Sequence, residues 1–267
     1  MPFRLVPLSS ARNPRLQGIR SAAAKGRATE DDLLVIEGPH LLEELIKSRW
    51  QPHTLLFTPE VFPAWEELAR EVDVETILIP ARIFEAIAAT ESTQGVMALA
   101  KPHGWNWSDL EESRPALIVA LDGIQDPGNA GTIIRSAEAF GATGIILLEY
   151  SARLSNGKLM RASAGSVFRM PVLDGVARPE FLSRAKENNW CCAALHPSEG
   201  TDISRFPFRR DSALIIGNEG RGVSNDLLAR STSVTIPTSR VESLNAASAC
   251  SIALYEASRQ RRDDESV

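Results

Sequence analysis

The sequence has no run of about 18 apolar residues, the length that a helix needs to span a bilayer, so no transmembrane segment is predicted. The stretch MPFRLVPLSSARNPRLQGIR lacks the apolar core of a secretory signal. Cysteine is scarce, since only Cys191, Cys192 and Cys250 are present, and their spacing is not that of a metal site. We therefore expect a cytoplasmic protein with reduced, buried thiols, no metal and no membrane partner.

Acidic residues are missing from two stretches of an otherwise acidic chain. The net charge is −5 over 267 residues, yet the first 27 residues carry six basic side chains and no acidic one, which leaves −11 for the rest. Residues 151–170 likewise contain four basic residues and no acidic one. Because phosphate contacts require local basic patches, this distribution favours a nucleic-acid partner, with a solvated basic arm as the alternative.

Apolar runs and amphipathic stretches alternate in the first half of the chain. The pattern predicts strands at 33–38, 54–58, 76–80 and 95–100, and helices at 40–48, 64–72 and 81–89. This order predicts a small α/β domain with a largely parallel sheet. Residues 101–115 then break the periodicity with Pro, Gly and charge, which predicts a linker with one short helix at 108–112.

The second half repeats the α/β alternation. Strands are predicted at 116–121, 144–149, 191–195, 213–217 and 233–237, and helices are expected to follow Asn129, Pro179, Ser224 and Ser243. The polar stretch from Ser258 onward is expected to be frayed.

Three polar loops each follow a predicted strand of the second half, where open α/β sheets bind ligands. In the first, DPGNAGTIIR, Asn129 is expected to cap a helix. Arg135 lies four residues after Gly131 and so shares a face with the helix N-terminus, where Glu138 could hold its guanidinium. A helix N-terminus beside an arginine suits a phosphate or a developing oxyanion, and a capped helix with a surface Arg–Glu pair is the alternative.

The other two loops are rich in glycine and in small residues. The loop IIGNEGRG has three glycines, which let a ligand approach the main chain, and Glu219 is its only acid. It is not G-x-G-x-x-G and lacks the P-loop lysine, which argues against a dehydrogenase or a nucleotide hydrolase. The third loop follows a strand that ends at Ile236. There, Ser243 is expected to cap a helix that begins with Leu244 and Asn245 and is dense in Ala and Ser.

Taken together, DPGNAGTIIR, IIGNEGRG, and IP followed by ESLNAASA resemble the three motifs of the SpoU (TrmH-like) RNA 2'-O-methyltransferases of the SPOUT superfamily. LVIEGPHLLEEL and TQGVMALA resemble the RNA substrate-binding domain often fused ahead of that catalytic domain. The resemblance implies an RNA-binding domain at 1–101 with a basic arm at 1–27, a linker at 102–115 and a methyltransferase domain at 116–262.

The fold implied by this resemblance is a C-terminal α/β knot, a deep trefoil, with a smaller N-terminal α/β domain. The implied cofactor is S-adenosylmethionine, and the implied assembly is a homodimer. By motif position, the residues expected at the cofactor are Gly217, Asn218, Gly220, Ile236, Leu244 and Ala247. The residues expected to be catalytic are Asn129, Arg135, Glu219, Ser243 and Asn245.

The implied reaction explains why the first loop has no obvious nucleophile of its own. The nucleophile is a ribose hydroxyl of the RNA, so the enzyme positions groups and steadies charge. The family arginine, here Arg135, is often considered the general base, but a guanidinium with a pKa above ~12 stays protonated. We therefore favour Arg135 as the group that stabilises the alkoxide or an adjacent phosphate, with Asn129 orienting the hydroxyl. Glu219, with Asn245 and Ser243, then organises Arg135 or relays the proton.

Ribosomal RNA is the expected substrate, because a separate docking module and a basic arm suit a structured stem-loop. A tRNA is the near alternative. A non-catalytic RNA-binding or ribosome-assembly protein is a different class, against which the combined presence of Asn129, Arg135, Glu219 and Asn245 argues. The four histidines, among them His196, show no partner pattern and are interpreted as ordinary loop or surface residues.

Overall fold

The computed structural model describes residues 3–262, which form two compact units. The first unit contains the chain up to residue 104 together with residues 154–169. The second contains residues 105–153 and the chain from residue 170 onward. Residues 154–169 therefore belong to the first unit, although the chain on either side of them belongs to the second.

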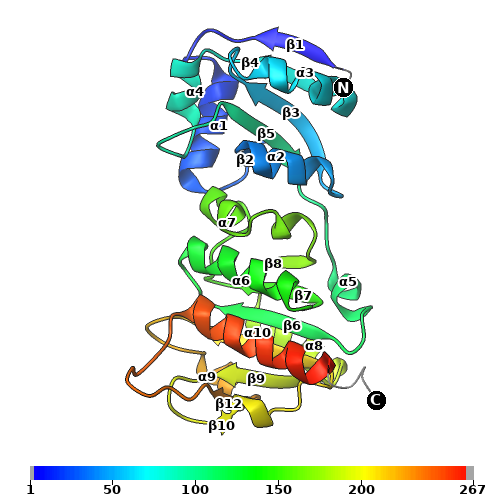
Figure 1. Ribbon diagram of the computed structural model, residues 1–267, viewed down its shortest axis with the longest axis vertical. Helices are drawn as coiled ribbons and strands as arrows, with labels where there is room; N and C mark the ends of the chain where they lie inside the picture. The colour runs from blue at the N-terminus through cyan, green and yellow to red at the C-terminus, as the bar shows by residue number, and fades with distance from the viewer. Residues whose placement is uncertain (1–2, 263–267) are drawn as a thin grey trace. The chain divides into compact units, whose positions relative to one another are not determined.

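The first unit is built on a five-stranded sheet in the order β1-β4-β3-β5-β2 (Figure 1). Its strands are β1 (Arg4–Pro7), β2 (Leu34–Glu37), β3 (Gln51–Phe57), β4 (Glu75–Leu78) and β5 (Val96–Lys101). β4 pairs in parallel with β1 and β3, whereas β5 lies antiparallel between β3 and β2. The predicted parallel sheet is thus correct except for β5.

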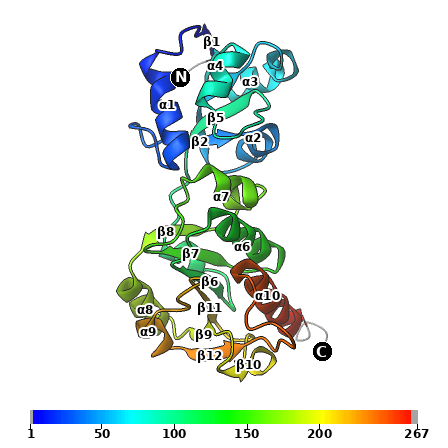
Figure 2. The same ribbon diagram turned by 90° about the vertical axis from the view of Figure 1, so that its left-hand side faces the viewer.

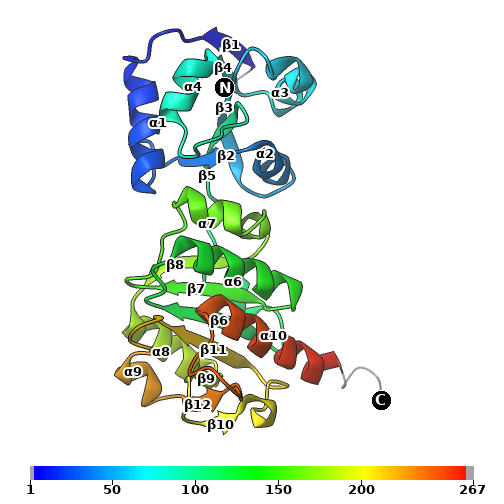
Figure 3. The same cartoon turned by 60° about the vertical axis from the view of Figure 1, so that its left-hand side comes forward.

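Helices cover both faces of this sheet (Figure 3). They are α1 (Pro14–Lys25), α2 (Pro39–Ile46), α3 (Glu66–Val72) and α4 (Ala81–Ile87). α1 belongs to the predicted basic arm, and it packs through Leu16, Ile19 and Ala22 into a core with Phe84 of α4. These apolar positions lie on one side of α1, so its basic side chains are left toward solvent.

Residues 154–169 attach to this unit through a short helix, α7 (Gly157–Ala162). Arg161 lies 3.9 Å from Glu37, and Arg169 forms an ion pair with Glu44. Phe168 packs edge-on against Trp50, with ring centroids 4.9 Å apart. Part of the basic patch predicted from the sequence is therefore matched by carboxylates of the same unit.

The second unit is built on a seven-stranded, all-parallel sheet in the order β10-β12-β9-β11-β6-β7-β8. Its strands are β6 (Leu117–Asp122), β7 (Gly144–Leu148), β8 (Val172–Val176), β9 (Cys191–Leu195), β10 (Thr201–Asp202), β11 (Ser212–Gly217) and β12 (Thr232–Thr235). Five of these match the predicted strands, whereas the short β8 and β10 were not predicted. The sheet agrees with the expected α/β class, and the knot stays a prediction of the resemblance.

Helices pack on both faces of the large sheet (Figure 2). They are α5 (Trp107–Glu111), α6 (Pro127–Ala139), α8 (Arg178–Glu187), α9 (Asn225–Leu228) and α10 (Ala246–Arg262). α6 and α10 lie side by side, joined by the Ser136–Ser251 hydroxyl contact at 2.8 Å and by Phe140 against Tyr255. The opposite face holds a core to which Leu110 of α5, Phe181 of α8 and Leu227 of α9 contribute.

The end of α10 corrects the expectation of a frayed tail. Residues up to Arg262 are helical, and residues 263–267 lie outside the described range. The Arg261 guanidinium donates to the carbonyls of Pro115, Ala116, Phe208 and Arg210 at 2.6 to 3.1 Å. Burial lowers the pKa of Arg261 below its ordinary value. These carbonyls precede β6 and β11, so Arg261 fastens α10 to the amino edge of the sheet.

Candidate active site

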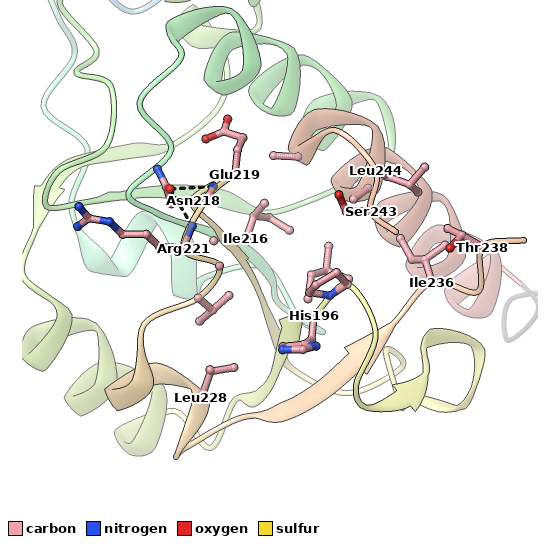
Figure 4. Close-up of a pocket in the computed structure, with 18 of the residues that line it drawn as sticks. His196, Ile216, Asn218, Glu219, Arg221, Leu228, Ile236, Thr238, Ser243 and Leu244 are labelled. Carbon is pink, nitrogen blue, oxygen red and sulfur yellow. Dashed lines mark hydrogen bonds between the residues drawn. The ribbon is translucent and has the colours of Figure 1, made fainter. Parts of the chain in front are cut away.

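The three motif loops meet at the carboxyl edge of the large sheet. β11 lies between β6 and β9, and β12 lies beside β9, so the loops after these four strands are neighbours. Figure 4 shows Asn218 and Arg221 on one side of the resulting pocket, and Ile236, Ser243 and Leu244 on the other. The prediction that each motif loop follows a strand of the second half is confirmed.

Asn218 organises the loop that follows β11. Its side-chain oxygen accepts hydrogen bonds from the main-chain N–H groups of Gly220 at 3.0 Å and Arg221 at 3.1 Å (Figure 4). Its side-chain amide donates to the carbonyl of Gly123 at 2.8 Å. A single side chain therefore closes the second motif loop into a turn and ties it to the first motif loop.

Gly217 is required by the path of the chain itself. A Cβ atom at this position would lie 2.2 Å from the carbonyl carbon of Gly222 and 2.2 Å from the nitrogen of Val223. Real Cβ atoms do not approach backbone this closely, so no other residue fits the turn. The glycine was predicted from access of a ligand to the main chain, whereas the structure adds a packing reason.

A chain of hydrogen bonds joins one polar residue from each motif. The Asn129 amide donates to Oε1 of Glu219 at 2.8 Å, and the Asn245 amide donates to Oδ1 of Asn129 at 3.1 Å. Asn129 is therefore held at both ends of its side-chain amide. Three of the residues predicted to be catalytic are in direct contact, although the two pairs are 90 and 116 positions apart in sequence.

Two predicted helix caps are wrong by a few residues. α6 is capped by Asp126, whose carboxylate accepts from the N–H of Asn129 at 2.8 Å, so Asn129 lies inside the first turn. α10 begins at Ala246, and Asn245 accepts from the N–H of Ala247 at 2.9 Å. Ser243 is thus not the cap. These shifts leave the Asn129 side chain available for contacts with the other two motifs.

Arg135 lies on the exposed side of α6, one turn beyond Gly131. The expected contact between its guanidinium and Glu138 stays a prediction. The neighbouring positions Ile133, Ile134 and Ala137 are buried against the sheet and α10. The Arg135 guanidinium is therefore directed away from the core and is accessible to an anionic group.

The pocket has a cavity volume of about 480 Å³, within the range of small-molecule sites. Among the predicted site residues, those that line it are Gly217, Asn218, Glu219, Gly220, Ile236, Ser243 and Leu244. Ala247 is buried in the first turn of α10 and does not line it. Asn129 and Asn245 reach the pocket only through their hydrogen bonds to Glu219 and to each other.

One part of the lining was missed from the sequence. Leu195 ends β9 and His196 and Pro197 follow it, and all three line the pocket. The Nδ1 atom of His196 accepts from the N–H of Glu199 at 2.9 Å, so in a neutral ring Nε2 carries the proton. His196 was interpreted as an ordinary loop residue. Only the position of β9 between β11 and β12 brings it to the site.

The described residues contain no group of three or more His, Cys, Asp or Glu side chains that could hold a metal ion. A search of the same residues finds no helix long and apolar enough to cross a membrane.

Comparison with known families gives two matches along the chain. The SpoU rRNA Methylase family matches residues 116–255, and the MRM3-like substrate binding domain matches residues 13–98. The first range contains all three motif loops, and the second lies within the first compact unit.

Individual relatives match over nearly the whole chain. The 23S rRNA (guanosine(2553)-2'-O)-methyltransferase RlmP of Bacillus subtilis (strain 168) is 30% identical over 251 residues, which is 93% of this chain and 97% of the relative. The 23S rRNA (uridine(2479)-2'-O)-methyltransferase of Streptomyces viridochromogenes is 29% identical, over 94% of this chain and 92% of the relative. The crystal structure of the SpoU methyltransferase AviRb from Streptomyces viridochromogenes, in complex with AdoMet, matches with a TM-score of 0.83 and 27% identity, covering 94% of this chain and all of that one.

The fold and the motif loops define an S-adenosylmethionine-dependent RNA 2'-O-methyltransferase with an α/β catalytic domain. The chain belongs to the SpoU rRNA methylase family. The pocket fits the cofactor, because its lining combines the apolar residues Ile216, Ile236 and Leu244 with polar residues such as Asn218 and Ser243. An adenosine and an amino-acid group require both kinds of surface.

Proposed function

We propose that this enzyme methylates a ribose 2'-hydroxyl of ribosomal RNA in the large ribosomal subunit. The observation that carries the proposal is the Glu219–Asn129–Asn245 chain beside the pocket, on a fold whose relatives of matching length are named for 23S rRNA. A tRNA substrate is the alternative, and labelling of total RNA separates the two. A substrate of this kind implies a cytoplasmic enzyme.

The cofactor would be held by the turn at Gly217–Gly220 on one side and by Ile236 and Leu244 on the other. When bound, it supplies a methyl group attached to a positively charged sulfur that serves as the leaving group. Ala247 supports this site indirectly, because its N–H donates to Asn245 and fixes the start of α10. Ser243 adds a hydroxyl to the lining.

The chain's own residues position the ribose and steady charge. Arg135 binds the phosphate beside the reacting ribose or the developing alkoxide, since its guanidinium points away from the core. Asn129 orients the 2'-hydroxyl with the amide capacity that Glu219 and Asn245 leave unused. In this arrangement Glu219 and Asn245 act on Asn129 and set the direction of its amide.

The first unit would dock the RNA. We assign substrate binding to residues 1–101, the connection to 102–115 and catalysis to 116–262. The exposed basic side chains of α1, such as Arg20, suit phosphate contacts, because α1 buries only its apolar side. The match of residues 13–98 to a substrate-binding domain supports this assignment.

We further propose a homodimer that uses the outer side of α10. Ile252 and Tyr255 of this helix are 42% and 52% exposed, and the Tyr255 ring is covered only in part, edge-on, by Phe140 of α6. Large apolar side chains on an exposed helix face suit association with a second copy. Analytical ultracentrifugation of the wild type and of Tyr255→Glu would test this, with a lighter species expected for the variant.

The decisive test is transfer of labelled methyl from S-adenosylmethionine to total RNA from cells that lack this gene, with Arg135→Ala as control. We expect label in ribosomal RNA that is lost in the variant, and a modified linkage that resists alkaline cleavage. Label confined to tRNA would mean that the substrate is tRNA and not ribosomal RNA. A wild type that neither binds the cofactor nor transfers label would support a non-catalytic RNA-binding protein instead.

A further inference from the structure

Tyr150 is an aromatic residue in an unusual position at the carboxyl edge of the large sheet. It follows β7, and 74% of its surface is exposed, the largest fraction among the exposed large hydrophobic residues of the described chain. Its φ angle is +70°, in the left-handed region that non-glycine residues seldom adopt. Neither feature favours folding, because an exposed ring buries no surface and the backbone conformation is strained.

The turn that carries Tyr150 is fixed to the first motif loop. The Ser151 hydroxyl donates to the carbonyl of Leu121 at 2.8 Å and accepts from the N–H of Gly123 at 2.9 Å. The N–H of Ala152 donates to the carbonyl of Ile124 at 2.7 Å. Tyr150 is therefore held in a fixed relation to the loop that leads to Asn129.

A guanidinium group lies against the Tyr150 ring. The Cζ atom of Arg178 is 5.9 Å from the ring centroid. Arg178 donates through Nε to Oδ1 of Asp122 at 2.7 Å, and Asp122 is only 2% exposed. This hydrogen bond raises the pKa of Arg178 above its ordinary value. The second oxygen of Asp122 accepts from the N–H of Ser224 at 2.8 Å, so the positive charge beside the ring is anchored from two loops.

We propose that Tyr150 is a stacking platform for an unpaired base of the substrate RNA next to the methylated nucleotide. The inference rests on the proposed function. Sequence-specific recognition of RNA commonly stacks splayed bases on tyrosine and on arginine planes, and a ring paired with a cation offers both a stacking face and attraction for the neighbouring phosphate. Tyr150 would thus determine which RNA segment enters the site, without touching the cofactor.

The test compares Tyr150→Ala, Tyr150→Gly and Tyr150→Phe with the wild type, using ribosomal RNA from a strain that lacks the gene. For Tyr150→Ala and Tyr150→Gly we expect the KM for RNA to rise roughly ten-fold, in line with the loss of one base–aromatic stack. Tyr150→Phe keeps the ring and should stay within about two-fold of the wild type. The Kd for S-adenosylmethionine should not change in any of the three.

Tyr150→Gly separates binding from folding. Glycine adopts a positive φ without strain, so this variant should melt no lower than the wild type while binding RNA more weakly. An unchanged KM for RNA in Tyr150→Ala and Tyr150→Gly would overturn the inference. So would an equal loss in Tyr150→Phe.

Direct RNA binding keeps the inference separate from the proposed function. If the wild type transfers no methyl group to ribosomal RNA, the proposed function fails, and filter binding of the same RNA to the wild type and Tyr150→Ala still tests the platform. Weaker binding by Tyr150→Ala would support it. Equal binding, or no binding by either protein, would overturn it.

Discussion

The two sheets of this enzyme distribute their loops differently. All neighbouring strands of the seven-stranded sheet are parallel, so the loops after β6, β9, β11 and β12 open at one edge. In the five-stranded sheet, β5 runs against its neighbours, so the carboxyl ends of its strands are divided between two edges. The pocket and the Glu219–Asn129–Asn245 chain lie on the first kind of edge.

This difference shows what each architecture can supply. A parallel edge concentrates main-chain groups and side chains from distant motifs in one small volume, which a reaction requires. The mixed sheet instead presents helices and a broad outer surface, and α1 places basic side chains there. Changes to the pocket and to the Glu219–Asn129–Asn245 chain should therefore affect chemistry, whereas changes to the exposed basic side chains of the small unit should affect RNA affinity.

The largest expected effect on the chemistry comes from Arg135. Replacement by Ala should lower kcat by about 100- to 1,000-fold, because it removes a donor aimed at developing charge. The Kd for S-adenosylmethionine should stay near that of the wild type, since Arg135 does not line the pocket. Single-turnover methyl transfer and isothermal titration calorimetry measure the two quantities. An Arg135→Lys variant with a near-normal rate would contradict a bidentate role.

A smaller but still large effect is expected from Gly217→Ala. The added methyl would meet the backbone of Gly222 and Val223, so we expect a loss of about 1–3 kcal/mol in the free energy of unfolding and weaker cofactor binding. Gly220→Ala is the matched control, because its Cβ would meet only Oδ1 of Asn218, at 3.6 Å. Thermal melting with and without cofactor measures both variants, and equal behaviour of the two would refute the packing argument.

A moderate effect, restricted to RNA, is expected on the small unit. Replacing Arg12 and Arg20 by Gln should weaken RNA binding. The slope of log K against the logarithm of the salt concentration should also become shallower, by up to about one for each phosphate that is no longer neutralised. The matched control is Arg70→Gln on α3, which removes a positive charge paired with Glu66 at 2.7 Å. Filter binding at several salt concentrations gives the slopes. A change in kcat at saturating RNA would contradict the proposal that the first unit binds RNA and only the second unit takes part in catalysis.

The smallest effect concerns the pH dependence of the small unit. Glu75 of β4 accepts a hydrogen bond from Arg15 of α1 at 2.5 Å, which lowers the pKa of Glu75 below its ordinary value of 4.5. Its stabilising contribution is therefore present above pH 4.5 and is lost as the pH falls through the lowered pKa. Glu75→Gln should cost under ~1 kcal/mol at about pH 7 and almost nothing in strong acid. Urea unfolding at both pH values tests this, and an equal difference at both would exclude the linkage.

Much of the catalytic unit could be predicted because its signals are local. Apolar runs marked five of its seven strands, and the rule that ligands bind beyond the carboxyl ends of parallel strands brought three loops together. His196 could not be found this way, since it reaches the pocket only because β9 pairs between β11 and β12. Asp126 and Asn245 were missed as caps because several nearby polar residues could serve equally well in a sequence pattern.

Long-range pairing explains the remaining differences. The ion pairs of Arg161 with Glu37 and of Arg169 with Glu44 hold residues 154–169 to the first unit, and no periodicity connects positions so far apart. β1 was overlooked because it has four residues and pairs only at the edge of its sheet.

α10 begins beside Asn129 at the carboxyl edge and ends, about 25 Å further on, where Arg261 binds the carbonyls that precede β6 and β11. The helix therefore contacts the sheet at both its carboxyl edge and its amino edge. If the motif loops close around a ligand at the carboxyl edge, they would fix the start of α10, and the helix would reduce motion at the amino edge as well. Slower amide hydrogen exchange at the start of β6 on cofactor binding would be the signature of this mechanical connection, far from any atom that the cofactor touches.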